Sequence, residues 1–169
     1  MSTPEMVIAA DTAARMTRGR PRSRQRLEPG TLALLRNVPI FSSLSARHVR
    51  RIARLASEAT FPPRRKIVER GVRGDAFYVV VEGSAKVYKG VVPSGRPIAR
   101  LGPGDFFGEM ALLDGGPRTA TVVADSRVRL IKLPRASFRR LLISEPTVAV
   151  GILETMARRA RAREPVASQ

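Results

Sequence analysis

The sequence contains no cysteine and only one histidine, His48. Structural disulfides, zinc–thiolate sites and cysteine nucleophiles are therefore excluded. His48 lies among arginines on a predicted helix, where we expect a surface residue rather than a metal ligand or a catalytic base. The composition thus predicts a protein without a metal site.

Long hydrophobic runs are also absent. The longest stretches, such as Phe77 to Val81, are far too short to span a bilayer, and residues 1–30 lack the apolar core of a secretory signal. Hydrophobic residues make up 43% and charged residues 27% of the 169 residues, a balance typical of one globular domain. We expect a cytoplasmic protein with no membrane span and a single hydrophobic core.

Acidic residues are scarce. The sequence has 14 acidic and 31 basic residues, which gives a net charge of +17. Residues 36–66 alone carry +7, from eight basic residues and one acidic residue. Such a charge favours an anionic partner, although a compositional preference for arginine explains part of it, since only four basic residues are lysines. Aromatic residues make up 5% and do not interleave the basic runs as a base-stacking platform requires, so specific nucleic-acid binding is not expected.

The first part of the chain changes from a polar pattern to a helical one. Residues 1–30 alternate arginine with glycine, proline and polar residues, and predict a disordered basic tail. Residues 31–58 predict N-terminal helices. Ser45 is a suitable N-cap, and Val49 and Ile52 begin an apolar stripe at helical spacing.

Residues 59–133 consist of short β-type runs separated by glycine, proline and aspartate. This regular punctuation predicts a compact antiparallel barrel or roll. The expected strands are Lys66–Glu69, Ala76–Glu82, Ser84–Lys89, Pro97–Leu101, Thr119–Ala124 and Val128–Leu133.

Residues 134–163 return to helical spacing and predict two C-terminal helices, followed by a tail at 164–169. Ser144 is expected to cap the last helix, which should begin near Thr147. The predicted fold class is α+β and mainly β: an antiparallel, jelly-roll-like β-roll with N-terminal helices and two C-terminal helices.

The segment from Phe106 to Val122, inside the predicted roll, departs from the pattern of short β-type runs. Gly108 allows a special turn or a close approach of the backbone. A short helix from Glu109 to Leu113 would offer free N–H groups to an anion. A Gly-Gly-Pro turn then delivers Arg118, whose guanidinium can hold a phosphate through forked hydrogen bonds, while a nearby carboxylate can accept from a sugar hydroxyl.

This segment is similar to the phosphate-binding cassette of the cyclic-nucleotide-binding domain family, whose pattern is F-G-E, then small and apolar residues, then P-R-[TSA]-A. Phe107-Gly108-Glu109 and Pro117-Arg118-Thr119-Ala120 match that pattern in order and at the family's spacing. The resemblance covers about Leu35 to Arg158. It implies a domain at residues 31–163 that binds cAMP or cGMP and is not an enzyme.

The resemblance also implies roles for individual residues. Arg118 should pair with the exocyclic phosphate, and Glu109 should accept a hydrogen bond from the ribose 2′-hydroxyl. Backbone N–H groups around Gly108, Met110, Ala111 and Ala120 should cradle the phosphate oxygens. A hydroxyl at the position of Thr119 can reach a syn guanine or the phosphate, so Thr119 permits cGMP without requiring it, and cAMP is slightly favoured.

In this family the C-terminal helices close over the base after phosphate capture. The resemblance therefore implies a hinge near Pro134 to Ser144 and a lid helix from Thr147 to Arg163. Ile152, Met156 and Arg159 are the candidates for the lid residue that covers the base. The signal should pass through these helices to a protein partner, or to a second copy in a homodimer.

Three alternatives stay open at this point. The domain is a stand-alone sensor, or a catabolite-activator-type regulator represented without its DNA-binding half, since only six residues follow Arg163. It could also be a related β-roll that has lost nucleotide binding, with Glu109 and Arg118 forming an internal ion pair. A metal-dependent cupin enzyme builds its site from several histidines, which this chain lacks.

Overall fold

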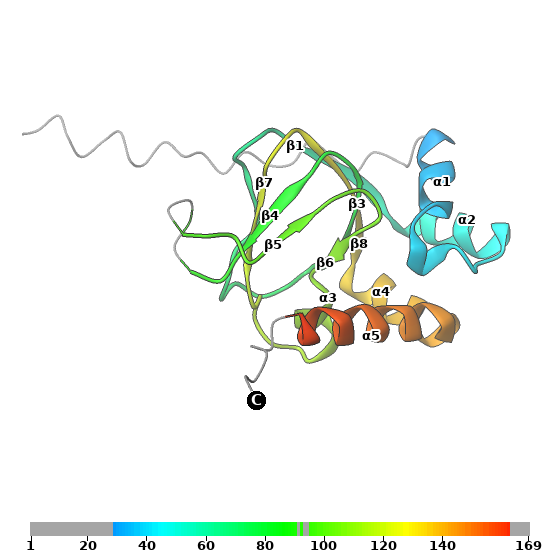
Figure 1. Ribbon diagram of the computed structural model, residues 1–169. Coiled ribbons are helices and arrows are strands. Elements are labelled where there is room, and N and C mark those ends of the chain that lie inside the picture. The colour runs from blue at the N-terminus through cyan, green and yellow to red at the C-terminus, as the bar shows by residue number, and fades with distance from the viewer. Residues whose placement is uncertain (1–28, 91, 93–94, 163–169) are drawn as a thin grey trace, which may run out of the picture.

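The computed structural model describes residues 29–90, 92 and 95–162. Two four-stranded antiparallel sheets form a roll, with helices gathered at one end and along one side (Figure 1). This arrangement confirms the predicted fold class. The tail expected at 1–30 lies almost wholly outside the described residues, as does the one at 164–169.

Three short helical elements precede the roll: α1 (Pro29–Arg36), the 3-10 helix η1 (Pro39–Phe41) and α2 (Ala46–Leu55). The expected cap of α2 is confirmed, because the Ser45 side chain accepts a hydrogen bond from the His48 backbone N–H. This bond satisfies one of the donors that the first turn of a helix leaves free.

The first sheet has the order β1-β8-β3-β6, and the second has the order β2-β7-β4-β5. Each of the six expected strand runs contains a strand, but the sheets hold two more, β1 and β6. The strands are β1 (Ser57–Phe61), β2 (Lys66–Val68), β3 (Ala76–Glu82), β4 (Ala85–Tyr88), β5 (Ala99–Leu101), β6 (Phe106–Phe107), β7 (Thr121–Ala124) and β8 (Val128–Pro134).

Strand β3 is buried on both faces, which explains its continuous apolar run. Side chains alternate between the faces of a strand. Phe77, Val79 and Val81 accordingly pack into the core that the helices cover. Tyr78 and Val80 pack into the second core, enclosed between the two sheets. The central strand therefore holds the two halves of the core together.

Three further helices complete the fold: α3 (Glu109–Leu113), α4 (Arg135–Ser144) and α5 (Pro146–Arg161). The prediction that Ser144 caps the last helix is wrong, because Ser144 is the final residue of α4 and its hydroxyl donates to the Leu141 carbonyl. Glu145 occupies the cap position instead. Pro146 follows in the first turn, where its missing N–H costs nothing.

Candidate functional site

The short helix α3 connects β6 to the loop that leads into β7, and Gly108 stands at its start. Gly108 has φ 88°, in the left-handed region that glycine adopts without strain. A Cβ at this position would overlap Arg118 Nη1 and lie 3.0 Å from the Ala76 carbonyl oxygen. Gly108 is therefore required both by the backbone turn and by the guanidinium packed against it.

Arg118 is the buried cation of this region, with a side chain that is 4% exposed. Its Nη1 donates to the Gly108 carbonyl at 2.8 Å and its Nη2 to the Ala76 carbonyl at 2.7 Å. Nη2 also lies 3.6 Å from the exposed carboxylate of Asp75. Burial lowers the pKa of Arg118, against the opposing effects of Tyr78, Asp75 and Glu109. An anion beside this guanidinium would offset the cost of burying its charge.

The backbone around Arg118 is fixed from both sides. Its N–H donates to the Val72 carbonyl and its own carbonyl accepts from Gly71 N, both at 2.8 Å. Arg118 directly precedes the expected strand Thr119–Ala124, but β7 begins only at Thr121. The backbone of Arg118 is therefore held by the turn at residues 69–72 and not by a strand.

Glu109, the first residue of α3, is 5% exposed. Its Oε1 lies 3.6 Å from Nη1 of Arg159, which comes from α5. Arg159 Nη2 also donates to the Phe106 carbonyl at 2.8 Å, and its guanidinium carbon lies 4.8 Å from the centre of the Phe106 ring. The last helix therefore contacts both the carboxylate and the strand that precedes it.

The start of α4 is tied to the same region through Arg135. Its Nη2 donates to the Gly74 carbonyl at 2.9 Å and to the Ala111 carbonyl at 3.1 Å. One guanidinium thus joins α4 to α3 and to the loop before β3.

A cavity of about 430 Å³ opens between the second sheet, α3 and the last turns of α5. All seven predicted binding residues line it: Gly108, Glu109, Met110, Ala111, Arg118, Thr119 and Ala120. Of the three candidate lid residues, Met156 and Arg159 line it as well. Ile152 does not, because it is 1% exposed within the core under the helices.

The opposite wall of the cavity was not predicted as part of a site. Val68, Val87 and Val122 come from β2, β4 and β7, and Lys89 and Ile98 lie beyond them. The alternation along these strands turns the three valines toward the interior of the roll. The cavity thus joins a cation and a carboxylate on one side to an apolar wall on the other. It suits a flat ligand with an anionic group and hydroxyls at one end.

Among the residues that the structure describes, no group of three or more His, Cys, Asp or Glu side chains could hold a metal ion. The same part of the chain has no helix that is long and apolar enough to cross a membrane.

Comparison with known proteins identifies chains that are similar in sequence and in fold. Residues 58–145 match the sequence model of the family described as the cyclic nucleotide-binding domain. A cAMP-dependent protein kinase regulatory subunit of Aspergillus fumigatus is 42% identical over 110 residues, which are 65% of this chain and 26% of that protein. The chain spans about a quarter of the length of the curated relatives it matches.

Two solved structures share the fold. The regulatory domain of Toxoplasma gondii PKA, co-crystallised with cAMP, is 30% identical with a TM-score of 0.65, and the match covers 75% of this chain and 48% of that one. The catabolite activator protein of Thermus thermophilus is 33% identical with a TM-score of 0.65, and the match covers 73% and 59% of the two chains.

Proposed function

Since this chain belongs to the cyclic nucleotide-binding domain family, we propose that its cavity binds cAMP or cGMP and that the domain acts as a sensor of that ligand. The observation that carries the proposal is the position of Arg118 and Glu109 on the wall of one cavity of about 430 Å³. This volume disfavours the alternative of a related β-roll that has lost nucleotide binding, since a ligand still has room beside both residues.

Arg118 supplies the charge that pairs with the cyclic phosphate. Its guanidinium donates to two carbonyls and lies 3.6 Å from the Asp75 carboxylate. A phosphate oxygen is a stronger acceptor for a guanidinium than a neutral carbonyl is. Free N–H groups at the start of α3, around Gly108, Met110 and Ala111, and the N–H of Ala120 cradle the phosphate oxygens. Glu109 accepts a hydrogen bond from the ribose 2′-hydroxyl.

The base occupies the apolar side of the cavity. Val68, Val87 and Val122 line this side and offer apolar contacts to a purine ring. Thr119 Oγ1 lies 3.7 Å from Met110 Sδ, a weak contact that leaves the hydroxyl available to a guanine or a phosphate. Thr119 therefore permits either cyclic nucleotide, and we favour cAMP because the similar regulatory subunits carry cAMP in their names.

The lid of the site is α5, and Arg159 and Met156 are its closing residues. Both line the cavity, whereas Ile152 is held in the core. Binding shifts α4 and α5 relative to the roll, because a ligand selects the helix position that contacts it best. Val150 and Leu153 are 52% and 60% exposed on α5 and offer an apolar surface to a protein partner or a second copy. The domain acts in the cytoplasm without catalysing a reaction and without a metal.

Titration calorimetry with cAMP, cGMP and 5′-AMP tests this function directly. We expect saturable binding of a cyclic nucleotide, weaker binding of 5′-AMP, and a higher melting temperature with the bound ligand. Arg118→Ala removes a charge-assisted interaction of about 1.5–3 kcal/mol and should weaken binding by about one to two orders of magnitude. Arg127→Ala is the matched control, because Arg127 is exposed and does not line the cavity.

Two results would contradict the proposal. One is an unchanged melting temperature of the wild-type protein at millimolar cyclic nucleotide. The other is equal binding by the Arg118→Ala and Arg127→Ala proteins, once circular dichroism has shown that both are folded.

A further inference from the structure

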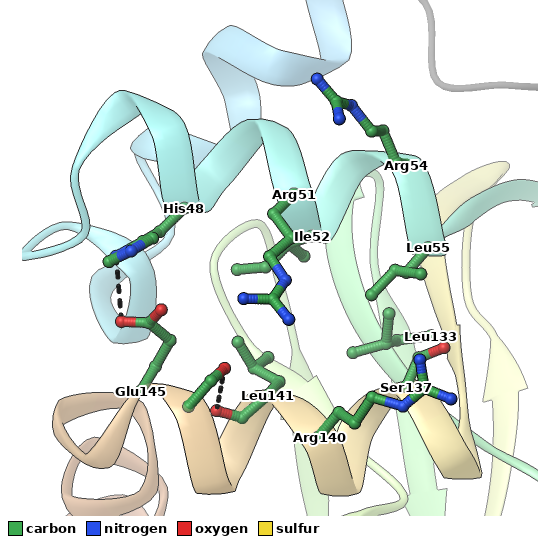
Figure 2. Close-up of a pocket in the computed structure, with 11 residues that line it drawn as sticks. His48, Arg51, Ile52, Arg54, Leu55, Leu133, Ser137, Arg140, Leu141 and Glu145 are labelled. Atoms are coloured by element: carbon green, nitrogen blue, oxygen red, sulfur yellow. Dashed lines mark hydrogen bonds and ion pairs between the residues drawn. The ribbon is translucent and has the colours of Figure 1, made fainter.

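A second hollow of about 140 Å³ lies between α2 and α4 and shares no lining residue with the nucleotide cavity. The two helices run side by side in opposite directions, with His48 facing Glu145 at one end and Leu55 facing Leu133 at the other (Figure 2). We call this hollow the α2–α4 groove. The proposed function makes no use of it.

The floor of the α2–α4 groove is apolar and recessed. Ile52, Leu133 and Leu141 form it, and each is at most 5% exposed. A volume of about 140 Å³ is close to the ~150 Å³ of an apolar cavity that accommodates a benzene molecule. The floor therefore has room for one large apolar side chain, and only a group that projects between the helices can reach it.

The edges of the groove are strongly basic. Helices α2 and α4 together contain seven arginines and no acidic residue. Arg51 extends from α2 toward α4, and Arg140 lies along the near edge of α4 (Figure 2). Within residues 29–90, 92 and 95–162, neither side chain has a hydrogen bond or an ion pair.

Among the residues that the structure describes, Glu145 is the one carboxylate that lines the groove, and its Oε2 lies 3.1 Å from His48 Nδ1. This contact closes one end of the groove and pairs the Glu145 carboxylate with His48. The groove thus presents unpaired cations above an apolar floor, and the complementary ligand carries carboxylates on either side of an apolar side chain.

We propose that the α2–α4 groove docks an acidic segment of a partner protein, anchored by one leucine or aromatic side chain and flanked by aspartate or glutamate. His48 to Leu55 spans about 10 Å along α2, so about two turns of a helix fit between the ends. A flat bilayer or a nucleic-acid duplex cannot place an apolar group on the recessed floor. A second copy of this chain, with its net charge of +17, is a poorer complement to the arginines than an acidic partner is.

The experiment titrates the full chain into a fluorescein-labelled, alanine-based peptide of about fifteen residues, long enough to form a helix. Its single central leucine is flanked by glutamates on the same helical face. We expect a saturable rise in anisotropy that weakens as salt increases. Replacing the leucine by alanine, or the glutamates by glutamine, should weaken binding about tenfold each.

The protein variants distinguish the groove from general charge attraction. Arg51→Gln with Arg140→Gln should weaken binding about tenfold. Arg50→Gln with Arg139→Gln removes the same charge from the same helices at exposed positions outside the groove, and should change the affinity less than about twofold. Both variants should fold, because the substituted side chains are exposed.

Three outcomes would overturn the proposal. The first is an equal loss of affinity in the two double variants. The second is unchanged binding of the peptide without leucine. The third is that the Arg51 and Arg140 substitutions weaken binding of duplex DNA or of phosphatidylserine vesicles but do not weaken binding of the peptide. None of these measurements requires a cyclic nucleotide, so failure here leaves the proposed function standing.

Discussion

The guanidinium of Arg159 lies 3.6 Å from the carboxylate of Glu109 and joins the last helix to the proposed ribose-binding residue. The same side chain donates to the Phe106 carbonyl at 2.8 Å. Two elements far apart in the sequence, β6–α3 and the final turns of α5, are thereby connected. This contact tethers the proposed lid helix to the strand and the short helix beside it.

Loss of this tether should loosen α5. We expect Arg159→Ala to speed backbone hydrogen exchange in the last two turns of α5 by about tenfold, since a charge-assisted hydrogen bond contributes about 1.5–3 kcal/mol before solvent screening. Arg158→Ala is the matched control, because Arg158 is exposed and, within the described part of the chain, its side chain bonds to Thr155 of its own helix. Equal exchange rates in the two variants would show that Arg159 does not hold the lid.

Glu109 should determine how strongly the site prefers ribose. We expect wild-type protein to bind cAMP about tenfold or more tightly than 2′-deoxy-cAMP, because the carboxylate accepts from the 2′-hydroxyl. In Glu109→Ala the affinities for the two ligands should become nearly equal, as measured by calorimetry. A ratio that stays at the wild-type value would assign ribose recognition to another residue.

Gly108→Ala should reduce both stability and nucleotide binding. The new methyl group meets Arg118 and the Ala76 carbonyl at a position with φ 88°, and the combined strain is expected to cost about 1–3 kcal/mol. Gly115→Ala imposes a similar positive φ of 77° in open space, so it tests the backbone strain alone. Urea unfolding and calorimetry should show that only Gly108→Ala loses affinity. A loss of affinity in both variants would contradict a specific role for Gly108.

Stability should fall as the pH rises above about 10. Burial raises the pKa of the Tyr78 phenol in the folded state. Above the ordinary tyrosine pKa of about 10, the unfolded state therefore loses the phenol proton before the folded state does, and the free energy of unfolding falls. Lys132 acts in the same direction: burial alone would lower its pKa, but Tyr78 and Asp75 raise it, and this contribution is lost as the pH passes the raised value.

Tyr78→Phe removes the titrating phenol and keeps the ring. The urea midpoint of this variant should therefore depend less on pH than that of the wild-type protein, between about pH 8 and about pH 11. Identical pH profiles for the two proteins would mean that Tyr78 does not contribute to the alkaline loss.

The cassette could be predicted from the sequence because its chemistry is local. Gly108, Glu109 and Arg118 lie within eleven consecutive residues, and the structure brings all three to one cavity. The helix cap at Ser45 is equally local and was also predicted. The prediction for Ser144 failed because this serine is the last residue of α4. Glu145 therefore takes the cap position, and α5 begins at Pro146.

Features that depend on distant pairing could not be predicted in the same way. Strand β1 (Ser57–Phe61) is recognisable only through its pairing with β8, and β6 has only two residues. Ile152, Met156 and Arg159 all follow helical spacing, so only the packing of α5 assigns Ile152 to the core and the other two to the cavity. The α2–α4 groove likewise exists only because two helices some ninety residues apart lie together.

The two carbonyls that hold Arg118 differ in their freedom to move. The Ala76 carbonyl belongs to β3, a strand that is buried on both faces. We therefore expect this carbonyl to be the rigid partner of Arg118. The Gly108 carbonyl lies at the start of α3, a helix of only five residues, so we expect it to move more easily than the carbonyl in the strand. If the proposed anion attracts the guanidinium, the Gly108 carbonyl is therefore the partner expected to shift, and the Ala76 carbonyl the one expected to stay in place. The direction of any such movement follows from which two elements hold Arg118.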